Sequence, residues 1–146
     1  MKGRHVVAAI SLGSFAFGLS LGVAHAGSAY SAYDYFSTAG RQFSNQSGIH
    51  TNHDASHSAH ASTYIGHLNG NLPAGYIGSQ PVRRDASGAL QCQGTYSYSG
   101  GTAAAMSSVG CFINNHSTYS SKGATRTWDG SGYVSRWTLL SPNQNS

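Results

Sequence analysis

The chain has 146 residues, a formal net charge of +4 at pH 7 and only 8% charged residues. Lys2 and Arg4 lie in the first 26 residues, so the eight basic residues fall to six, against four acids, in the rest of the chain. The remaining charge of +2, without a basic cluster, speaks against a nucleic-acid partner. The sequence has no dinucleotide fingerprint, phosphate-binding loop or nucleophile elbow, and we therefore predict that the protein is not an enzyme.

Residues 1–26 have the features of a secretory signal peptide. A cationic start is followed by an uncharged, mostly apolar run over residues 6–24, which ends in Ala24-His25-Ala26. Small residues at this spacing are typical of a signal-peptidase site, so we predict cleavage before Gly27, secretion to the extracellular space and no membrane anchor after cleavage. An uncleaved N-terminal anchor is the alternative.

Residues 27–70 are rich in His, Ser and Tyr and poor in aliphatic side chains. Ile49, Ile65 and Leu68 are the only aliphatic residues larger than alanine in this segment. Because so few can bury little apolar surface, the composition predicts a disordered lead.

Aromatic residues are nevertheless frequent at the start of this lead. A flexible segment with aromatic side chains is suited to ordering on a partner, which would be another secreted protein or the cell wall. The alternative is a solvated spacer without a binding role. The candidate binding residues are Tyr30, Tyr33, Tyr35 and Phe36.

The histidines of the lead recur at steps of three and four residues. On a helix this spacing would place them on one face, where neutral imidazoles can share Zn²⁺, Cu²⁺ or Ni²⁺. The candidate metal ligands are His50, His53, His57 and His60. A stripe that becomes charged on acidification is a second interpretation, and compositional bias without a function is a third. No other cofactor is predicted.

Residues 71–146 have the pattern of a compact β domain. Segments of about eight to ten residues alternate with turn signals, of which Asp85-Ala86-Ser87-Gly88 and Asp129-Gly130-Ser131-Gly132 are the clearest. We predict an all-β fold, a small antiparallel sandwich or barrel of about five to six short strands. Residues 124–128 and 133–140 should form a hairpin, whose second strand has bulky residues on both faces and is expected to be covered on both sides.

Cys92 and Cys111 are the only cysteines, and in an exported chain they most simply form one disulfide. Trp128 and Tyr133 are further candidates for binding, since exposed aromatic rings stack on sugars or anchor protein partners. The predicted core contains Leu90, Cys92, Tyr96, Met106, Val109, Cys111, Phe112, Ile113, Trp128, Tyr133, Val134, Trp137 and Leu139.

Three segments resemble a group of small secreted proteins of streptomycetes and related actinobacteria. They are Pro73-Ala74-Gly75-Tyr76-Ile77-Gly78, the strand around Cys92, and the ending from Asp129-Gly130-Ser131-Gly132-Tyr133 to Ser141-Pro142-Asn143-Gln144-Asn145. The resemblance implies an exported β domain with one disulfide, and most of that group has no assigned activity. The layout of a flexible lead before a small β domain is also similar to the adaptor subunit of the umbrella toxin particles of streptomycetes.

The functional hypothesis from the sequence is therefore a secreted, non-enzymatic binding or adaptor protein, a component of an extracellular antibacterial complex, that engages its partner through the aromatic lead. The alternatives are a module that binds the cell wall or a polysaccharide, a histidine-rich metal-binding protein, and a small antibacterial toxin.

Overall fold

The computed structural model describes residues 27–146, so the predicted signal peptide lies outside the described residues. All regular elements of the described part are β-strands. They are β1 (Gly27–Tyr30), β2 (Asp34–Thr38), β3 (Arg41–Thr51), β4 (Ser58–His67), β5 (Ile77–Gln80), β6 (Val82–Asp85), β7 (Leu90–Gln93), β8 (Ser97–Tyr98), β9 (Ala105–Asn114), β10 (Thr118–Ser121), β11 (Ala124–Trp128), β12 (Tyr133–Trp137) and β13 (Gln144–Asn145).

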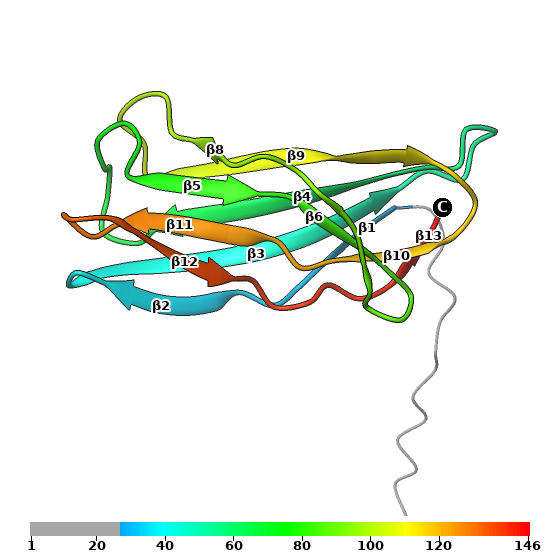
Figure 1. The fold of residues 1–146 in the computed structure, drawn as a ribbon, viewed down its shortest axis with the longest axis horizontal. Helices are drawn as coiled ribbons and strands as arrows, with labels where there is room; N and C mark the ends of the chain where they lie inside the picture. The colour runs from blue at the N-terminus through cyan, green and yellow to red at the C-terminus, as the bar shows by residue number, and fades with distance from the viewer. Residues whose placement is uncertain (1–26) are drawn as a thin grey trace, which may run out of the picture.

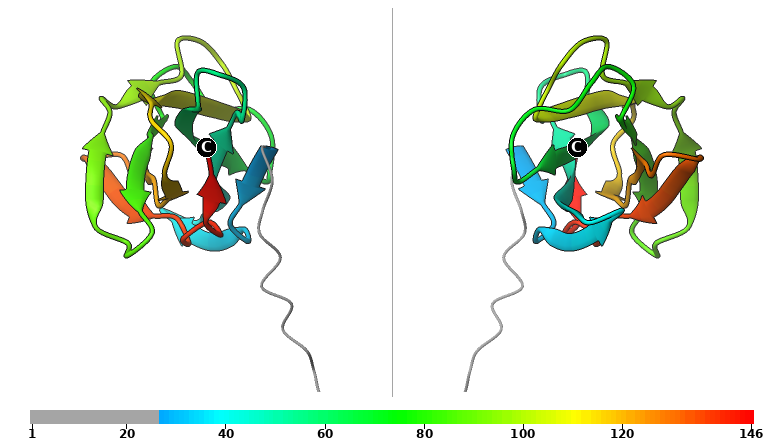
Figure 2. Two further views of the ribbon diagram at one scale, coloured as in Figure 1. Left: turned by 90° about the vertical axis from the view of Figure 1, so that its right-hand side faces the viewer. Right: turned by 90° about the vertical axis from the view of Figure 1, so that its left-hand side faces the viewer.

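The strands form two curved layers around one interior. The first layer is a five-stranded sheet in the order β1-β3-β4-β9, in which β2 also pairs with β3. The second layer combines two four-stranded sheets, β12-β11-β5-β8 and β13-β10-β6-β7. These two sheets continue into each other because only Pro81 separates β5 from β6 and only Lys122-Gly123 separates β10 from β11. Figures 1 and 2 show both layers wrapping around a shared centre.

The prediction of an antiparallel all-β fold is confirmed, since all strand pairs in the described residues are antiparallel. The expected number of about five to six strands was too low. The prediction of a disordered lead over residues 27–70 is wrong for this structure, because these residues form β1 to β4, including the two long central strands of the first layer (Figure 1).

Two small hydrophobic clusters occupy the interior. The larger one contains Phe36, Phe43, Ile65, Leu72 and Ile77, and the rings of Phe36 and Phe43 stack with centroids 5.6 Å apart. The second cluster contains Ala29, Ile49, Ala59 and Tyr119. All nine of these residues come from outside the predicted core, and six of them come from the segment that was expected to lack a core.

Buried polar side chains that form hydrogen bonds between the layers occupy much of the remaining interior. We call this region the polar middle. Asn45 Nδ2 donates to Thr125 Oγ1 at 2.9 Å, Ser47 Oγ donates to the Ser121 carbonyl at 2.9 Å, and Thr63 Oγ1 donates to the Gln80 carbonyl at 3.0 Å. Asn45, Ser47, Thr63 and Thr125 have no solvent exposure. Because these buried polar groups have partners across the layers, short polar side chains can take the place of aliphatic ones.

The predicted disulfide between Cys92 and Cys111 is confirmed, and it joins β7 of the second layer to β9 of the first. A β-bulge in β9 allows this connection. Ala59 pairs with Ile113 while Ala61 pairs with Gly110, so Cys111 and Phe112 together lie opposite His60. Cys111 adopts a φ of +59° and is buried, whereas the next side chain, Phe112, is 71% exposed.

The second half of the predicted hairpin is an edge strand rather than a covered one. β11 pairs with β12 as expected, but every residue of β12 is exposed, and β12 ends the order of its sheet. The predicted turns are confirmed: the carboxylates of Asp85 and Asp129 accept backbone hydrogen bonds from the residues that follow them. The predicted core residues that are exposed are Leu90, Val109, Phe112, Tyr133, Val134, Trp137 and Leu139.

Candidate functional site

Four rings cross the outer face of the first layer, one from each of four neighbouring strands. Phe112 of β9 contacts His60 of β4 at a centroid distance of 5.1 Å, and His60 stacks on His50 of β3 at 4.8 Å with an interplanar angle of 16°. His50 in turn meets Tyr30 of β1 edge to face at 5.4 Å. We call this set the ring row. The bulge at Cys111 contributes to it, since it turns Phe112 outward beside His60.

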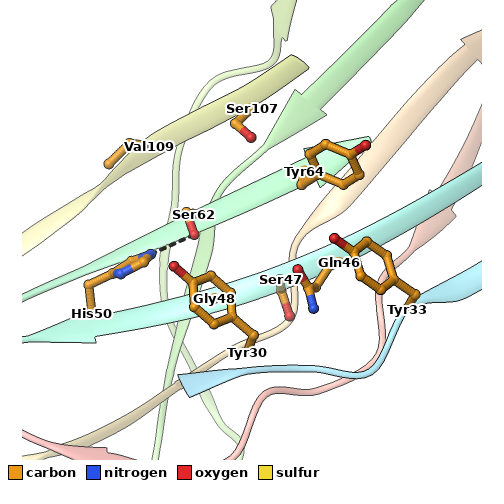
Figure 3. Close-up of a pocket in the computed structure, with 10 residues that line it drawn as sticks. All are labelled: Tyr30, Tyr33, Gln46, Ser47, Gly48, His50, Ser62, Tyr64, Ser107 and Val109. Atoms are coloured by element: carbon orange, nitrogen blue, oxygen red, sulfur yellow. Dashed lines mark hydrogen bonds between the residues drawn. The ribbon is translucent and has the colours of Figure 1, made fainter. Parts of the chain in front are cut away.

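A second group of rings comes from β4, from β2 and from the segment that joins β1 to β2. Tyr64 of β4 meets Tyr33 edge to face at 5.9 Å, and Tyr33 lies 6.2 Å from Tyr35. Between this group and the ring row is an open hollow of about 320 Å³, which we call the tyrosine groove (Figure 3). It is lined by Tyr30, Tyr33, Gln46, Ser47, Gly48, His50, Ser62, Tyr64, Ser107 and Val109.

Glycines form the floor beneath the tyrosine rings. A Cβ atom at Gly48 would lie 2.9 Å from the Tyr30 ring and 2.7 Å from Ser62 Oγ, so only glycine leaves room for the ring there. At Gly66 a Cβ atom would collide with the Tyr64 hydroxyl. Both rings therefore lie against backbone instead of projecting freely into solvent. The tyrosine groove is thus formed before any ligand arrives.

The polar groups of the tyrosine groove are uncharged hydrogen-bonding groups. His50 shares hydrogen bonds with Ser28 Oγ through Nδ1 at 2.6 Å and with Ser62 Oγ through Nε2 at 2.8 Å (Figure 3). Gln46 Nε2 donates to the Ser31 carbonyl at 2.8 Å. No aspartate, lysine or arginine is among the residues that line this groove. The arrangement can stack on a flat, neutral ligand and exchange hydrogen bonds with it, but it offers no carboxylate for acid or base chemistry.

Burial keeps the two histidines of the ring row neutral. Partial desolvation, with the neighbouring His60 as a second cause, lowers the pKa of His50 below its usual value of 6.5. Partial burial also lowers the pKa of His60. The pKa of Tyr64 is raised, again by burial and then by Tyr33. At neutral pH the ring row and the tyrosine groove are therefore uncharged.

Acidification should destabilise the protein through His50 and His60. Their pKa values are lower in the folded protein than in the unfolded chain, so the unfolded chain binds more protons as the pH falls below about 6.5. We expect the midpoint of urea unfolding to fall between pH 7.5 and pH 5.0. The lowered pKa values of Asp54, Asp85 and Asp129 act only below about pH 4.

The double variant H50Q/H60Q separates this effect from general acid sensitivity. Without the two imidazoles, the difference between the urea midpoints at pH 7.5 and pH 5.0 should shrink. An unchanged difference in this variant would show that the stacked histidines do not cause the pH dependence.

The structure separates the residues that the sequence nominated for binding. Tyr30 and Tyr33 line the tyrosine groove, and Tyr35 is 65% exposed beside Tyr33. Phe36 is 7% exposed and belongs to the larger hydrophobic cluster, so its proposed contact with a partner is wrong. Trp128 and Tyr133 lie on the second layer and are described below.

The four candidate metal ligands do not form one group. His50 and His60 are neighbours in the ring row, whereas His57 instead contacts His116 edge to face at 4.8 Å. His53 and His116 line a separate hollow of about 500 Å³. Within residues 27–146, no three His, Cys, Asp or Glu side chains are close enough to hold a metal ion. The four histidines do not share one helical face, because His50 and His60 lie on strands and His53 and His57 lie in the turn that connects them.

Several residues of this face were not among the candidate binding residues. Tyr64, Ser62 and Phe112 owe their position to pairing between strands far apart in the chain. One signal was present, because Ser62 and Tyr64 continue the two-residue alternation that begins at His60. The three and four residue spacing of the histidines directed attention to a helix instead.

No protein family, curated protein or solved structure matches this chain. The resemblance to small secreted actinobacterial proteins therefore stays a prediction. Residues 27–146 include no helix with the length and apolar character needed to cross a membrane.

Proposed function

We propose that this protein is an exported, non-enzymatic module that binds an uncharged polysaccharide in the tyrosine groove. The observation that carries the proposal is the combination of preformed tyrosine rings with uncharged hydrogen-bonding groups on an open sheet face. The disulfide between Cys92 and Cys111 fits an oxidising compartment outside the cytoplasm.

The chemistry of sugars matches this face on two counts. The C–H faces of a pyranose ring stack on aromatic rings, which Tyr30 and Tyr64 present on either side of the groove. Sugar hydroxyls both donate and accept hydrogen bonds, as do Ser62 and Gln46. The lining residues of the groove come from β1, β3, β4 and β9, so a ligand longer than one sugar unit can lie across the sheet.

A nucleic-acid ligand and the adaptor hypothesis are both less well supported. A nucleic acid would need cationic side chains to neutralise its phosphates, and none lines the groove. The adaptor hypothesis depended on a flexible aromatic extension, and it loses that support because Tyr30 and Tyr35 lie in strands β1 and β2.

Replacing Tyr64 with alanine should weaken polysaccharide binding about tenfold, since one stacking surface of the groove is lost. Affinity electrophoresis through gels containing glycol chitin or hydroxyethyl cellulose measures this directly, and pull-down with insoluble peptidoglycan extends it to a wall polymer. We expect the wild-type protein to be retarded by at least one of these uncharged polymers and the variant to migrate faster.

Trp137→Ala is the matched control, because Trp137 is a large aromatic residue that is 49% exposed on strand β12 of the other layer. It should be retarded like the wild-type protein. If no polymer retards the wild-type protein, or if Y64A is retarded as strongly, the proposal fails.

A further inference from the structure

The second layer carries its own set of aromatic rings, on its outer face and away from the tyrosine groove. Tyr96 stacks with Tyr98 at 6.1 Å, Tyr98 contacts Tyr133 at 4.9 Å, and Tyr133 meets Trp128 edge to face at 5.2 Å. We call these four rings the second ring row. An open hollow of about 240 Å³ adjoins it, lined by Ala74, Gly75, Tyr76, Trp128 and Tyr133.

These rings are held in place before any ligand binds. The Tyr133 hydroxyl donates a 2.7 Å hydrogen bond to the Gly75 carbonyl. The Tyr98 ring lies over Gly78, where a Cβ atom would approach its carbons to 2.7 Å. The same device, a tyrosine over a glycine of a neighbouring strand, places Tyr30 on the other layer. Little ordering of side chains is therefore needed when a ligand binds.

The second ring row differs from the first face in its charge. The Arg126 guanidinium lies 3.9 Å from the centre of the Tyr96 ring, and it donates hydrogen bonds to the Tyr98 hydroxyl at 2.9 Å and to Ser135 Oγ at 3.2 Å. These contacts occupy two of the five N–H groups of an arginine side chain and fix its plane. A second guanidinium, that of Arg41, lies over the ring of Tyr76, which lines the hollow, at 5.4 Å.

Three of the four aspartates of the chain are engaged in turns of their own. Asp54, Asp85 and Asp129 accept hydrogen bonds within their own turns, from residues two to six positions farther along the chain. A fixed guanidinium beside partly exposed aromatic rings is suited to a ligand that is both flat and anionic. The positive charges of Arg126 and Arg41 beside these rings oppose a cationic ligand.

We infer that the second ring row and Arg126 form a separate site for a carboxylated sugar unit of an acidic polysaccharide. The sugar ring stacks on Trp128 and Tyr133, and its carboxylate accepts hydrogen bonds from Arg126. The inference extends the proposed function to a second class of glycan, and the two sites lie on opposite layers. One molecule can thus bridge an uncharged and an acidic polymer.

Affinity electrophoresis with polygalacturonate, a polymer of carboxylated sugars, tests this site. We expect the wild-type protein to be retarded, R126Q to bind about tenfold more weakly because a charge-assisted hydrogen bond is lost, and W128A to bind more weakly because a stacking surface is lost. R126K retains the charge without the planar fork and should fall between R126Q and the wild-type protein.

Two controls remove the same kinds of group elsewhere. K122Q removes one positive charge outside the site, and W137A removes an exposed tryptophan outside the second ring row; both should bind polygalacturonate like the wild-type protein. Circular dichroism confirms that each variant is folded. Equal loss of binding in R126Q and K122Q would show that net charge alone causes the binding, and would overturn the inference. Binding by R126Q or W128A as strong as that of the wild-type protein would also overturn it.

The two proposals fail separately. Y64A should lose binding to the uncharged polymer and keep binding to polygalacturonate, and W128A should show the reverse. Loss of polygalacturonate binding in Y64A, with its fold intact, would contradict two independent sites.

Discussion

Replacing Phe43 with alanine should lower the free energy of unfolding by about 3–5 kcal/mol, the range seen when a buried phenylalanine is truncated. Phe43 is 1% exposed and stacks on Phe36 in the larger hydrophobic cluster. Truncation therefore leaves a cavity among Ile65, Leu72 and Ile77. Urea unfolding followed by circular dichroism measures the loss. For a protein of this size such a loss can remove most of the stability.

Tyr35→Ala is the matched control, because Tyr35 belongs to the same hairpin of β2 and β3 but is 65% exposed. It should change the free energy of unfolding by no more than about 0.5 kcal/mol. Equal and small effects of F43A and Y35A would mean that residues 27–70 contribute no core, and would contradict the arrangement of the first layer.

Removal of the disulfide should cost about 3 kcal/mol, because the bond closes a loop between residues 19 positions apart and so restricts the unfolded chain. Its position adds a second consequence. The bond ties β7 of the second layer to the bulged end of β9, beside Phe112 of the ring row. We therefore expect the double variant C92A/C111A to unfold at lower urea concentration and to bind its uncharged polymer more weakly.

The wild-type protein under reducing conditions provides the comparison for this variant. Its unfolding midpoint should move toward that of C92A/C111A, while the reductant should leave C92A/C111A itself unchanged. An unfolding midpoint that is the same with and without reductant would show that the disulfide adds nothing to stability.

The fold class, the disulfide and the turns were predictable because they depend on local signals. Asp85 and Asp129 accept hydrogen bonds from residues a few positions away, so short segments of sequence are sufficient to identify their turns. Residues 27–70 were judged disordered for lack of aliphatic side chains. That criterion fails here because Asn45, Ser47 and Thr63 are buried and find hydrogen-bond partners on the opposite layer.

The aromatic character of the candidate sites was also evident from the sequence, but their geometry was not. Tyr30 and Tyr33 were identified, yet Tyr64 lies on β4 and reaches Tyr33 only through the pairing of β3 with β4. For Phe36 and Phe112, the burial expected from the sequence is wrong in opposite ways. Phe36 was expected at the surface and is buried, and Phe112 was expected in the core and is exposed, because the bulge at Cys111 reverses the alternation of β9.

The polar middle has a consequence for the response of the protein to temperature. Exposure of apolar groups on unfolding raises the heat capacity, whereas exposure of polar groups lowers it. An interior built largely from Ser, Thr and Asn should therefore give a heat-capacity increment below the usual value of about 12–15 cal/mol/K per residue. The curve of stability against temperature then becomes broad and shallow, so stability changes little over a wide range of temperature.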